Sequence, residues 1–472
     1  MPLLFSPYCS IIIVDIFLAE NAILIYRVGG STMAFTKSLA EMEQSVPDSD
    51  ARKRLAAFYD DGAFTELDKF LAADGEVSSV VAGVGGVWTN TVYTFAQDIS
   101  VKGGAVNKAA ALKIKRVYEL AAKNGCPVVG FFDSKGADIN EGMAVLAEYG
   151  DIMKASAKIS GIVPQIAVVT GVCAGCAAMI ASMADVVIAT EKSELFLTSP
   201  FNNADGKIEG AGSALNAAKS GVCQILAKDD ADAVEKAKTL ISVLPANNLD
   251  VGYAEGFDEN DAAISASMNG ADVAAAVAQK GSIIEFGEKF GTAAYTALGT
   301  VSDSTVAFVA TDKAAKLTSA DCAKIARFVQ FADVFSIPVV TIVNTEGFEG
   351  SSAAELAGSV RDCARLAQIY ATATTVKVNI ISGKAFGAAF AAFNSADMSF
   401  AWENAQIAPM SPEAGKVFMG EELVTNPFAA ASQGMIDGVI DAADTRSVIT
   451  DALSICCSKN ENLARKHANY TF

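Results

Sequence analysis

Two small-residue loops, each following an apolar run and preceding a stretch rich in alanine, are the candidate chemical centres of this sequence. They are Gly175-Cys176-Ala177-Ala178 and Gly387-Ala388-Ala389. The first N–H groups of a helix have no partner inside the helix and lie at the positive end of its dipole, so they can hold a developing oxyanion. Small side chains suit this chemistry because they let a carbonyl group approach the amides. The same residues would also permit tight helix–strand packing, and the spacing alone leaves both interpretations open.

A second pair of loops supplies further candidate donors. Each follows a short apolar run that is typical of a buried strand: Ser134-Lys135-Gly136-Ala137 and Thr345-Glu346-Gly347-Phe348. Two amides from two loops are sufficient for an oxyanion hole. Side-chain catalysis is less favoured, because the only histidine is His467 and a serine or cysteine nucleophile would need it to return to a pocket. We therefore also predict no metal site in this chain.

These loops belong to an internal repeat with a spacing of about 211 residues. The repeated pairs include Lys113 and Lys324, Gly136 and Gly347, Gly175 and Gly387, and Asp185 and Asp397. Two copies of one fold normally give two related pockets. Two pockets suit a reaction that moves a group between two partners.

The bulk composition indicates a well-buried globular protein with two domains. At 472 residues the chain exceeds what one hydrophobic core usually serves, and 51% of the residues are hydrophobic. A formal net charge of −18 argues against nucleic acid as a partner, because phosphate backbones are bound by clustered lysine and arginine. The nine cysteines are mostly scattered, which favours reduced thiols and a cytoplasmic protein.

The predicted domains cover residues 33–255 and 256–472, and residues 1–32 differ from both. The apolar run at 11–14 is broken by Asp15 before it reaches the length of a membrane span. The start also lacks the positive charges of a signal peptide. We interpret residues 1–32 as an upstream extension that is not native, with Met33 as the true start. The intact mass of the natively expressed protein would test this interpretation.

Helical and strand-like runs alternate in both halves, which predicts α/β layers. From Met33 to about Ala82 the pattern is polar and helical. Apolar residues at helical spacing then predict a helix over 108–123, followed by a buried strand over 128–132. The remaining predicted elements of the N-terminal half are a helix over about 141–156, a strand over 165–170, a loop over 171–176 and a further helix. The C-terminal half repeats this succession from about Ser304.

Motifs in both halves carry a family resemblance. In the N-terminal half they are Asp98-x-x-Val101-x-Gly103-Gly104, Asp133-Ser134-x-Gly136-Ala137, Gly161-x-x-Pro164-Gln165 and Cys173-Ala174-Gly175. In the C-terminal half they include Gly347-Phe348, Lys384-Ala385-Phe386-Gly387, Ala401-Trp402 and Gly434-x-Ile436-Asp437. In this order, over about residues 80 to 469, the chain resembles the biotin-dependent carboxyltransferase subunits. These are the acyl-CoA carboxylase β-type and methylmalonyl-CoA decarboxylase α-type chains of the crotonase-like superfamily.

The resemblance implies an α/β fold of two tandem crotonase-like domains, each a ββα superhelix. It implies a carboxyl transfer between biotin on a carrier protein and a short-chain acyl-CoA (propionyl/methylmalonyl or acetyl/malonyl). The N-terminal domain would take the acyl-CoA and the C-terminal domain the biotin. By position, the Gly175 and Cys176 amides would hold the enolate, and those of Gly387 and Ala388 the biotin anion. The matching substrate-binding positions are Gly103, Gly104, Ser134, Gly136, Ala137, Gly347, Phe348 and Ala391.

The resemblance also implies partners outside this chain. Biotin would sit on a separate biotin carboxyl carrier protein, since this sequence has no Met-Lys-Met motif. A biotin carboxylase or a membrane decarboxylase subunit would complete the complex, which places the chain in the cytoplasm or at the periphery of a membrane complex. The active site would lie between subunits of a homo-oligomer built from dimers, as in a hexamer.

Among the departures from the family pattern, three lie at or near the predicted donor loops. Lys135 and Cys176 stand where the family usually has glycine, and Asp138 stands where it usually has arginine. Two alternatives stay open, and these departures motivate the second of them. One is a biotin-independent crotonase-like acyl-CoA hydrolase or decarboxylase, and the other is a non-catalytic scaffold paralogue in a carboxylase complex.

Overall fold

The computed structural model describes residues 25–28, 31–34, 38–44, 46, 48–73, 76–199, 209–254, 256–420 and 423–461. The chain divides into two compact units, residues 1–47 and 48–472. In the first unit, strands β1 (Ile25–Val28) and β2 (Ser31–Ala34) pair antiparallel and precede helix α1 (Leu39–Gln44). Residues 1–24 lie outside the described residues, so a native start at Met33 stays a prediction.

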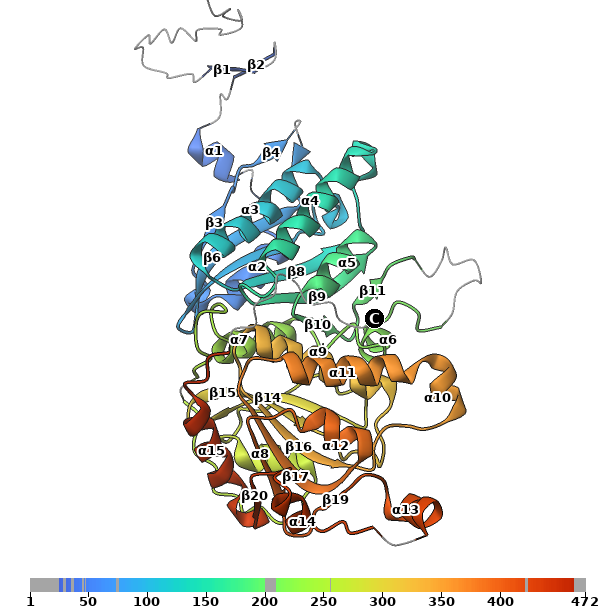
Figure 1. The fold of residues 1–472 in the computed structure, drawn as a ribbon. Helices are drawn as coiled ribbons and strands as arrows, with labels where there is room; N and C mark the ends of the chain where they lie inside the picture. Colours follow the sequence, from blue (N-terminus) through green and yellow to red (C-terminus); the bar gives the residue numbers. More distant parts are fainter. Residues whose placement is uncertain are drawn as a thin grey trace, which may run out of the picture. The chain divides into compact units, whose positions relative to one another are not determined.

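Two eight-stranded sheets with one topology form the second unit (Figure 1). The N-lobe, residues 48–254, contains β3 (Phe64–Leu67), β6 (Val80–Val87), β7 (Asn90–Gln97), β8 (Val128–Ser134), β9 (Gln165–Ala174), β10 (Val186–Thr190), β11 (Glu194–Phe196) and β12 (Ile225–Ala227). The C-lobe, residues 256–461, contains β13 (Ile284–Glu285), β14 (Tyr295–Val301), β15 (Ser304–Ala310), β16 (Val339–Thr345), β17 (Lys377–Phe386), β18 (Met398–Trp402), β19 (Gln406–Ala408) and β20 (Gly438–Ile440). A separate two-stranded sheet joins β4 (Ala72–Ala73) to β5 (Glu76–Val77).

The two sheets match strand for strand. The N-lobe order is β3-β6-β7-β8-β9-β10-β12 and the C-lobe order is β13-β14-β15-β16-β17-β18-β20, with β11 and β19 pairing with β9 and β17. In each sheet the first two pairings are antiparallel and the remaining ones are parallel. Even the register irregularity recurs, between Phe132 and Ser134 in β8 and between Val343 and Thr345 in β16. The sequence repeat is therefore a repeat of structure, and the predicted α/β layers are confirmed.

Helices cover both faces of each sheet, as parallel strands require. In the N-lobe, α2 (Asp50–Phe58) and α7 (Asp230–Val243) lie on one face, and α3 (Lys108–Asn124), α4 (Ala144–Ile159), α5 (Cys176–Met183) and α6 (Ala214–Lys219) on the other. In the C-lobe, α9 (Ser319–Val334), α11 (Ser359–Thr372) and α12 (Gly387–Phe393) lie on one face, and α8 (Gly270–Val277) and α15 (Thr445–Cys456) on the other. The remaining helices are α10 (Ser352–Ala357), α13 (Pro412–Met419) and α14 (Pro427–Ser432), with 3-10 turns η1 (Asp60–Gly62), η2 (Lys102–Gly104), η3 (Ile139–Glu141) and η4 (Ala442–Asp444).

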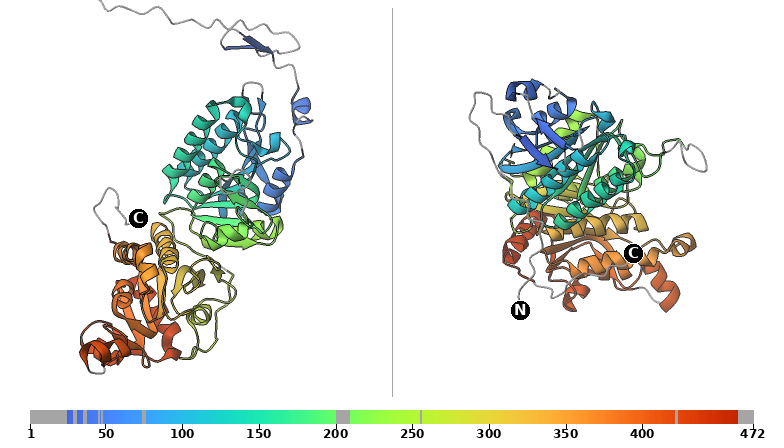
Figure 2. Two further views of the ribbon diagram at one scale, coloured as in Figure 1. Left: turned by 90° about the vertical axis from the view of Figure 1, so that its right-hand side faces the viewer. Right: turned by 90° about the horizontal axis from the view of Figure 1, so that it is seen from above.

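One continuous hydrophobic core joins the lobes. It combines α2 and α7 of the N-lobe with α9 and α11 of the C-lobe, and Figure 2 shows the two lobes as adjoining blocks of this unit. The predicted domain boundary after residue 255 falls in the irregular segment between α7 and α8, and it stays a prediction. Within the described part of the chain, we find no helix with the length and apolar character that a bilayer crossing requires.

Two sequence predictions of local structure are wrong. The polar segment up to Ala82 is helical only as far as Phe58, because Phe64–Leu67 pairs with the glycine-rich strand β6 instead. The predicted loop over 171–176 is strand as far as Ala174, because β11 pairs with this part of β9. In both cases a partner distant in sequence decides the conformation. The predicted helix over 108–123 is confirmed as α3, which Asn107 caps and Gly125 ends at φ 63°.

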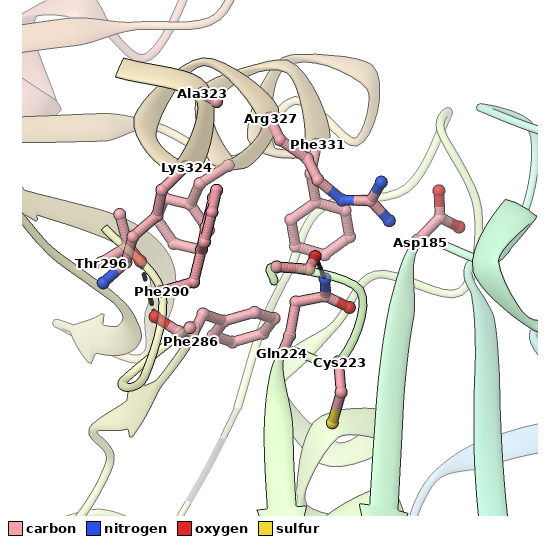
Figure 3. Close-up of a pocket in the computed structure, with 13 residues that line it drawn as sticks. Asp185, Cys223, Gln224, Phe286, Phe290, Thr296, Ala323, Lys324, Arg327 and Phe331 are labelled. Carbon is pink, nitrogen blue, oxygen red and sulfur yellow. Dashed lines mark hydrogen bonds between the residues drawn. The ribbon is translucent and has the colours of Figure 1, made fainter. Parts of the chain in front are cut away.

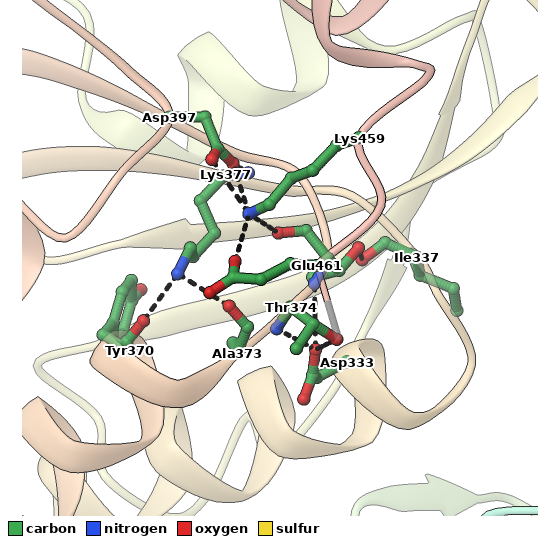
Figure 4. Close-up of polar contacts among 10 residues, drawn as sticks. Asp333, Ile337, Tyr370, Ala373, Thr374, Lys377, Asp397, Lys459 and Glu461 are labelled. Atoms are coloured by element: carbon green, nitrogen blue, oxygen red, sulfur yellow. Dashed lines mark hydrogen bonds and ion pairs between the residues drawn. The ribbon is translucent and has the colours of Figure 1, made fainter. Parts of the chain in front are cut away.

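Repeat-related aspartates immediately precede β10 in the N-lobe and β18 in the C-lobe, but they meet different cations. The Asp185 carboxylate accepts the Gln165 N–H and the Asp397 carboxylate accepts the Lys377 N–H, each at 2.8 Å. Asp397 is paired with Lys459, whose Nζ lies 2.8 Å from its carboxylate (Figure 4).

Asp185 instead faces Arg327, which comes from α9 of the other lobe (Figure 3). They border a cavity of about 50 Å³ whose lining includes aromatic side chains, among them Phe286 and Phe331. The Arg327 guanidinium donates to the Ala184 carbonyl at 3.1 Å, which links the lobes. Burial raises the pKa of Asp185 to about 7, although the Gln165 amide and the Arg327 charge oppose this shift.

Candidate functional site

The predicted N-lobe donors meet in one cavity at the carboxyl edge of the sheet. Neighbouring parallel strands end at the same edge, so the loops that follow β8 and β9 lie side by side. The cavity there has a volume of about 450 Å³. Its lining residues are Lys135, Gly136, Ala137, Leu146, Tyr149, Val172, Ala174, Gly175, Cys176, Phe196, Leu197 and Ser199.

At the start of α5, only one amide of the predicted pair is available. The Gly175 N–H donates to the Phe196 carbonyl at 2.9 Å, so the pairing of β9 with β11 already uses it. Cys176 is the first residue of α5, and the first-turn amides of a helix have no acceptor inside the helix. Gly175 allows this arrangement because its φ of 58° is unfavourable for other residues. The Cys176 N–H is therefore the donor that α5 offers to the cavity.

The loop after β8 offers a second amide. The Gly136 N–H donates to the Ser134 hydroxyl at 3.0 Å and is thereby used. The Val106 N–H donates to the Gly136 carbonyl, and the Asp138 N–H donates to the Val106 carbonyl, both at 2.9 Å. In such a parallel bridge the intervening residue, Ala137, points its N–H away from the partner chain. Ala137 and Cys176 thus form the pair of amides that can serve an oxyanion.

Three further predicted substrate-binding residues lie behind the cavity wall. Ser134 is fully buried, and neither Gly103 nor Gly104 lines the cavity. The Gly103 carbonyl accepts the Lys135 N–H at 3.0 Å. A Cβ at Gly104 would come within 2.2 Å of the Asp133 carbonyl oxygen, so only glycine permits this close approach. These residues brace the wall in this structure, and a substrate contact for them stays a prediction.

The C-lobe repeats the arrangement of the 134–138 loop. The Gly347 N–H donates to the Thr345 hydroxyl at 3.2 Å. The Leu317 N–H donates to the Gly347 carbonyl at 3.0 Å, and the Glu349 N–H donates to the Leu317 carbonyl at 2.8 Å. Phe348 is the intervening residue of this bridge and occupies the position of Ala137.

The start of α12 likewise repeats the start of α5. Gly387 has a φ of 57°, and a Cβ there would lie 3.0 Å from the Pro409 carbonyl oxygen. Ala388 and Ala391 are both exposed on α12. Every described residue that lines the N-lobe cavity belongs to the N-lobe, so one chain does not bring the two predicted donor sets into one cavity.

The residues that depart from the family pattern have identifiable contacts. The Lys135 side chain passes over Gly103, where a Cβ would lie 2.9 Å from Lys135 Cδ. The Asp138 carboxylate is buried and pairs with Lys102 Nζ at 2.9 Å, and this hydrogen bond lowers the pKa of Asp138. Cys176 is half-buried in the cavity wall.

The sequence interpretation missed the apolar wall of the cavity. Leu146 and Tyr149 come from α4, and Phe196 and Leu197 come from β11 and the residue that follows it. Their spacing in the sequence is that of ordinary core residues, so only their position beside Cys176 distinguishes them. His467 lies outside the described residues.

Comparisons with known proteins identify the family. Residues 49–419 match the carboxyl transferase domain. The methylmalonyl-CoA decarboxylase subunit alpha of Propionigenium modestum is 33% identical, over 89% of this chain and 92% of that protein. The propionyl-CoA carboxylase beta chain of Saccharopolyspora erythraea is 32% identical, over 93% of this chain and 92% of that protein. A crystal structure of the transcarboxylase 12S hexamer with hydrolysed methylmalonyl-coenzyme A bound matches with a TM-score of 0.84 at 30% identity, covering 92% of this chain and 94% of that chain.

Both the family and the fold class that the sequence motifs predicted are confirmed. The structural match extends over both lobes, in agreement with two tandem crotonase-like domains. The sequence match likewise reaches from α2 in the N-lobe to α13 in the C-lobe. This chain belongs to the carboxyl transferase domain family and is an enzyme of the carboxyltransferase class.

Proposed function

We propose that this chain moves a carboxyl group between biotin on a carrier protein and a short-chain acyl-CoA. The substrate pair is propionyl- and methylmalonyl-CoA or acetyl- and malonyl-CoA. The observation that carries the proposal is the pair of available amides, from Ala137 and Cys176, at one cavity of the N-lobe. The names of the relatives support the choice of substrate, since they specify methylmalonyl-CoA and propionyl-CoA.

In the N-lobe, the thioester oxygen accepts hydrogen bonds from the Ala137 and Cys176 amides. Negative charge collects on this oxygen when the α-carbon loses its carboxyl group or its proton. Amides that are already in place stabilise the charge without reorganisation, and the positive end of α5 adds to their effect. Because these interactions strengthen as the charge grows, they stabilise the transition state more than the bound substrate.

In the C-lobe, the start of α12 suits the ureido carbonyl of biotin. The exposed residues there, Ala388 and Ala391, carry only methyl groups and leave room for a bicyclic ring. The Ala388 amide, in the repeat position of Cys176, and the Phe348 amide, in the position of Ala137, are the donors that orient the carbonyl. Biotin supplies the ring nitrogen that carries the carboxyl group. The donors of this chain position the biotin ring and stabilise the negative charge on its ureido oxygen.

A complete site in this proposal requires two copies of the chain. The two donor sets do not share a cavity within one chain, and apolar side chains are exposed in both lobes. Ile139 and Met143 are each 85% exposed in the N-lobe, and Val417 and Phe418 are 80% and 79% exposed in the C-lobe. We propose that these surfaces pack between subunits of a dimer-based homo-oligomer, and the transcarboxylase 12S relative is a hexamer.

The remaining proposed partners are a biotin carboxyl carrier protein and either a biotin carboxylase or a membrane decarboxylase subunit. The family relationship supports these partners, because relatives include both carboxylase and decarboxylase subunits. We propose a cytoplasmic location, at the membrane periphery if the partner is a decarboxylase.

Turnover of a malonyl-type thioester tests the function. Purified protein is incubated with methylmalonyl-CoA or malonyl-CoA, with and without free biotin, and the acyl-CoA products are separated by chromatography. We expect propionyl-CoA or acetyl-CoA to form only with biotin. Equal turnover without biotin would instead identify a biotin-independent hydrolase or decarboxylase. No turnover, with acyl-CoA binding retained, would identify a scaffold.

A further inference from the structure

We infer that the Tyr149 hydroxyl donates a hydrogen bond to the thioester oxygen, as a third donor beside the Ala137 and Cys176 amides. This inference rests on the proposed function and adds a side chain to a site otherwise built from backbone. Tyr149 belongs to α4 and lines the N-lobe cavity together with both amide-bearing residues.

The Tyr149 hydroxyl lacks a hydrogen-bond partner in the part of the chain that the structure describes, although only 3% of the residue is exposed. Other buried tyrosines in this protein are satisfied. The Tyr59 hydroxyl donates to the Val92 carbonyl at 3.0 Å and lies 2.8 Å from the Thr94 hydroxyl, and the Tyr370 hydroxyl lies 2.9 Å from the Thr341 hydroxyl. A buried donor without a partner costs about 1–3 kcal/mol. Tyr149 lines the cavity where an acyl oxygen would bind, and a hydrogen bond to that oxygen would remove this cost.

The surroundings make the phenol a permanent donor. Burial raises the pKa of Tyr149, and the thiols of Cys176 and Cys173 raise it further. The hydroxyl therefore keeps its proton at physiological pH and acts by hydrogen bonding rather than by proton transfer. A neutral donor in an apolar wall strengthens as its acceptor gains charge, which is the behaviour that an enolate oxygen requires.

Substrate binding must open the path to this donor. The hydroxyl oxygen is closed to bulk solvent in the free protein. Cys176 is half-buried in the same wall and has a short side chain with a single rotatable bond to its sulfur. We propose that the Cys176 side chain rotates when substrate binds. This rotation lets the thioester oxygen reach the Tyr149 hydroxyl while the same oxygen accepts from the Cys176 amide.

Tyr149→Phe tests the inference because it removes the hydroxyl and keeps the ring. We expect kcat for biotin-dependent turnover to fall about 10- to 100-fold, since removal of one oxyanion donor costs about 100- to 1,000-fold and two amides remain here. KM should change less than about threefold, because the hydrogen bond is weak to the bound thioester and strengthens as negative charge develops in the transition state. The Tm should stay equal or rise, because an unsatisfied buried group is lost. Tyr59→Phe is the matched control, and it should lower the Tm while leaving kcat unchanged.

An infrared measurement gives a second readout that does not depend on turnover. The carbonyl stretch of ¹³C-labelled propionyl-CoA should shift to lower frequency on binding the wild-type protein, and part of that shift should be absent in Tyr149→Phe. An unchanged kcat, a raised KM at unchanged kcat, or identical carbonyl bands would each overturn the inference. If the wild type lacks biotin-dependent turnover but the band difference is present, the proposed function fails while the Tyr149 contact stands. If neither turnover nor a band shift is seen, both fail.

Discussion

Replacing Asp185 with asparagine should change the pH dependence of stability. In the wild type the Gln165 N–H donates to the Asp185 carboxylate at 2.8 Å. Asparagine keeps an oxygen that can accept this hydrogen bond but removes the titrating group. The pKa of Asp185 is raised from 3.8 to about 7, mainly because the carboxyl group is buried between the lobes. The Arg327 charge opposes this shift without cancelling it.

The size and sign of the effect follow from this pKa. One pKa unit corresponds to about 1.4 kcal/mol, so ionising Asp185 in the folded protein costs up to about 4 kcal/mol relative to the unfolded chain. Between the two pKa values the folded protein holds a proton that the unfolded chain has lost. The free energy of unfolding must therefore fall as the pH rises through this window. In the folded state near pH 5, residue 185 is neutral in both the wild type and Asp185→Asn. Above about pH 7 it is neutral only in the variant.

Denaturant unfolding of both proteins at about pH 5 and pH 8 measures the difference. We expect the stability of Asp185→Asn relative to the wild type to be about 2–3 kcal/mol greater at the higher pH than at the lower, because part of the window between the two pKa values is already passed at pH 5. Asp397→Asn is the matched control from the repeat. It removes a carboxylate that is paired with Lys459 at 2.8 Å, so it should lose stability at both pH values. The reasoning is refuted if the stability difference between Asp185→Asn and wild type is the same at both pH values.

Two further substitutions test the cavity and its support. Cys176→Pro removes the proposed donor amide at the first position of a helix, where proline is tolerated. Its kcat should fall about 100- to 1,000-fold in the biotin-dependent assay. Cys176→Ala keeps the amide, so its kcat should fall far less. Equal losses in the two variants would rule out the amide as the important group. Gly104→Ala should lower stability by about 2 kcal/mol or more in thermal unfolding, because φ is 70° and the added Cβ would meet the Asp133 carbonyl oxygen at 2.2 Å. Gly86→Ala has open space around its added Cβ, so its effect should stay within about 0.5 kcal/mol, and a comparable loss in both variants would contradict the steric argument.

Local patterns in the sequence predicted much of the fold. The helix over 108–124 has apolar residues at helical spacing, an asparagine cap and a terminal glycine, and all three signals are local. The strand Phe64–Leu67 has no such signal, since its conformation depends on pairing with β6. The continuation of β9 to Ala174 likewise depends on β11, which follows about 20 residues later in the chain.

The site was predictable only as far as its chemistry is backbone chemistry. Gly175-Cys176 and Gly136-Ala137 mark two loops that can present amides, and the structure brings them to one cavity. Which amides are available could not be read from the sequence, because the acceptor of the Gly175 N–H is Phe196. Tyr149 was missed for a similar reason. In the sequence it is one more apolar position of a helix, and only its unpartnered hydroxyl beside Cys176 distinguishes it.

The two copies of the fold use one repeated arginine position differently. Lys113 and Lys324 are buried at equivalent positions, and their Nζ atoms donate to the equivalent carbonyls of Val80 and Ala294 at 3.1 Å and 2.8 Å. The arginines three residues later differ. Arg116 pairs with Asp68 within its own lobe at 2.8 Å, whereas Arg327 crosses to the N-lobe. Each lysine joins a helix to the sheet of its own lobe, so both copies can keep this contact whatever the other lobe does. The repeated arginine faces solvent in the N-lobe, as Arg116, and faces the N-lobe from the C-lobe, as Arg327. A duplicated chain could therefore join its two halves through a new contact of this arginine, while the amide-bearing loops of both halves kept the same geometry.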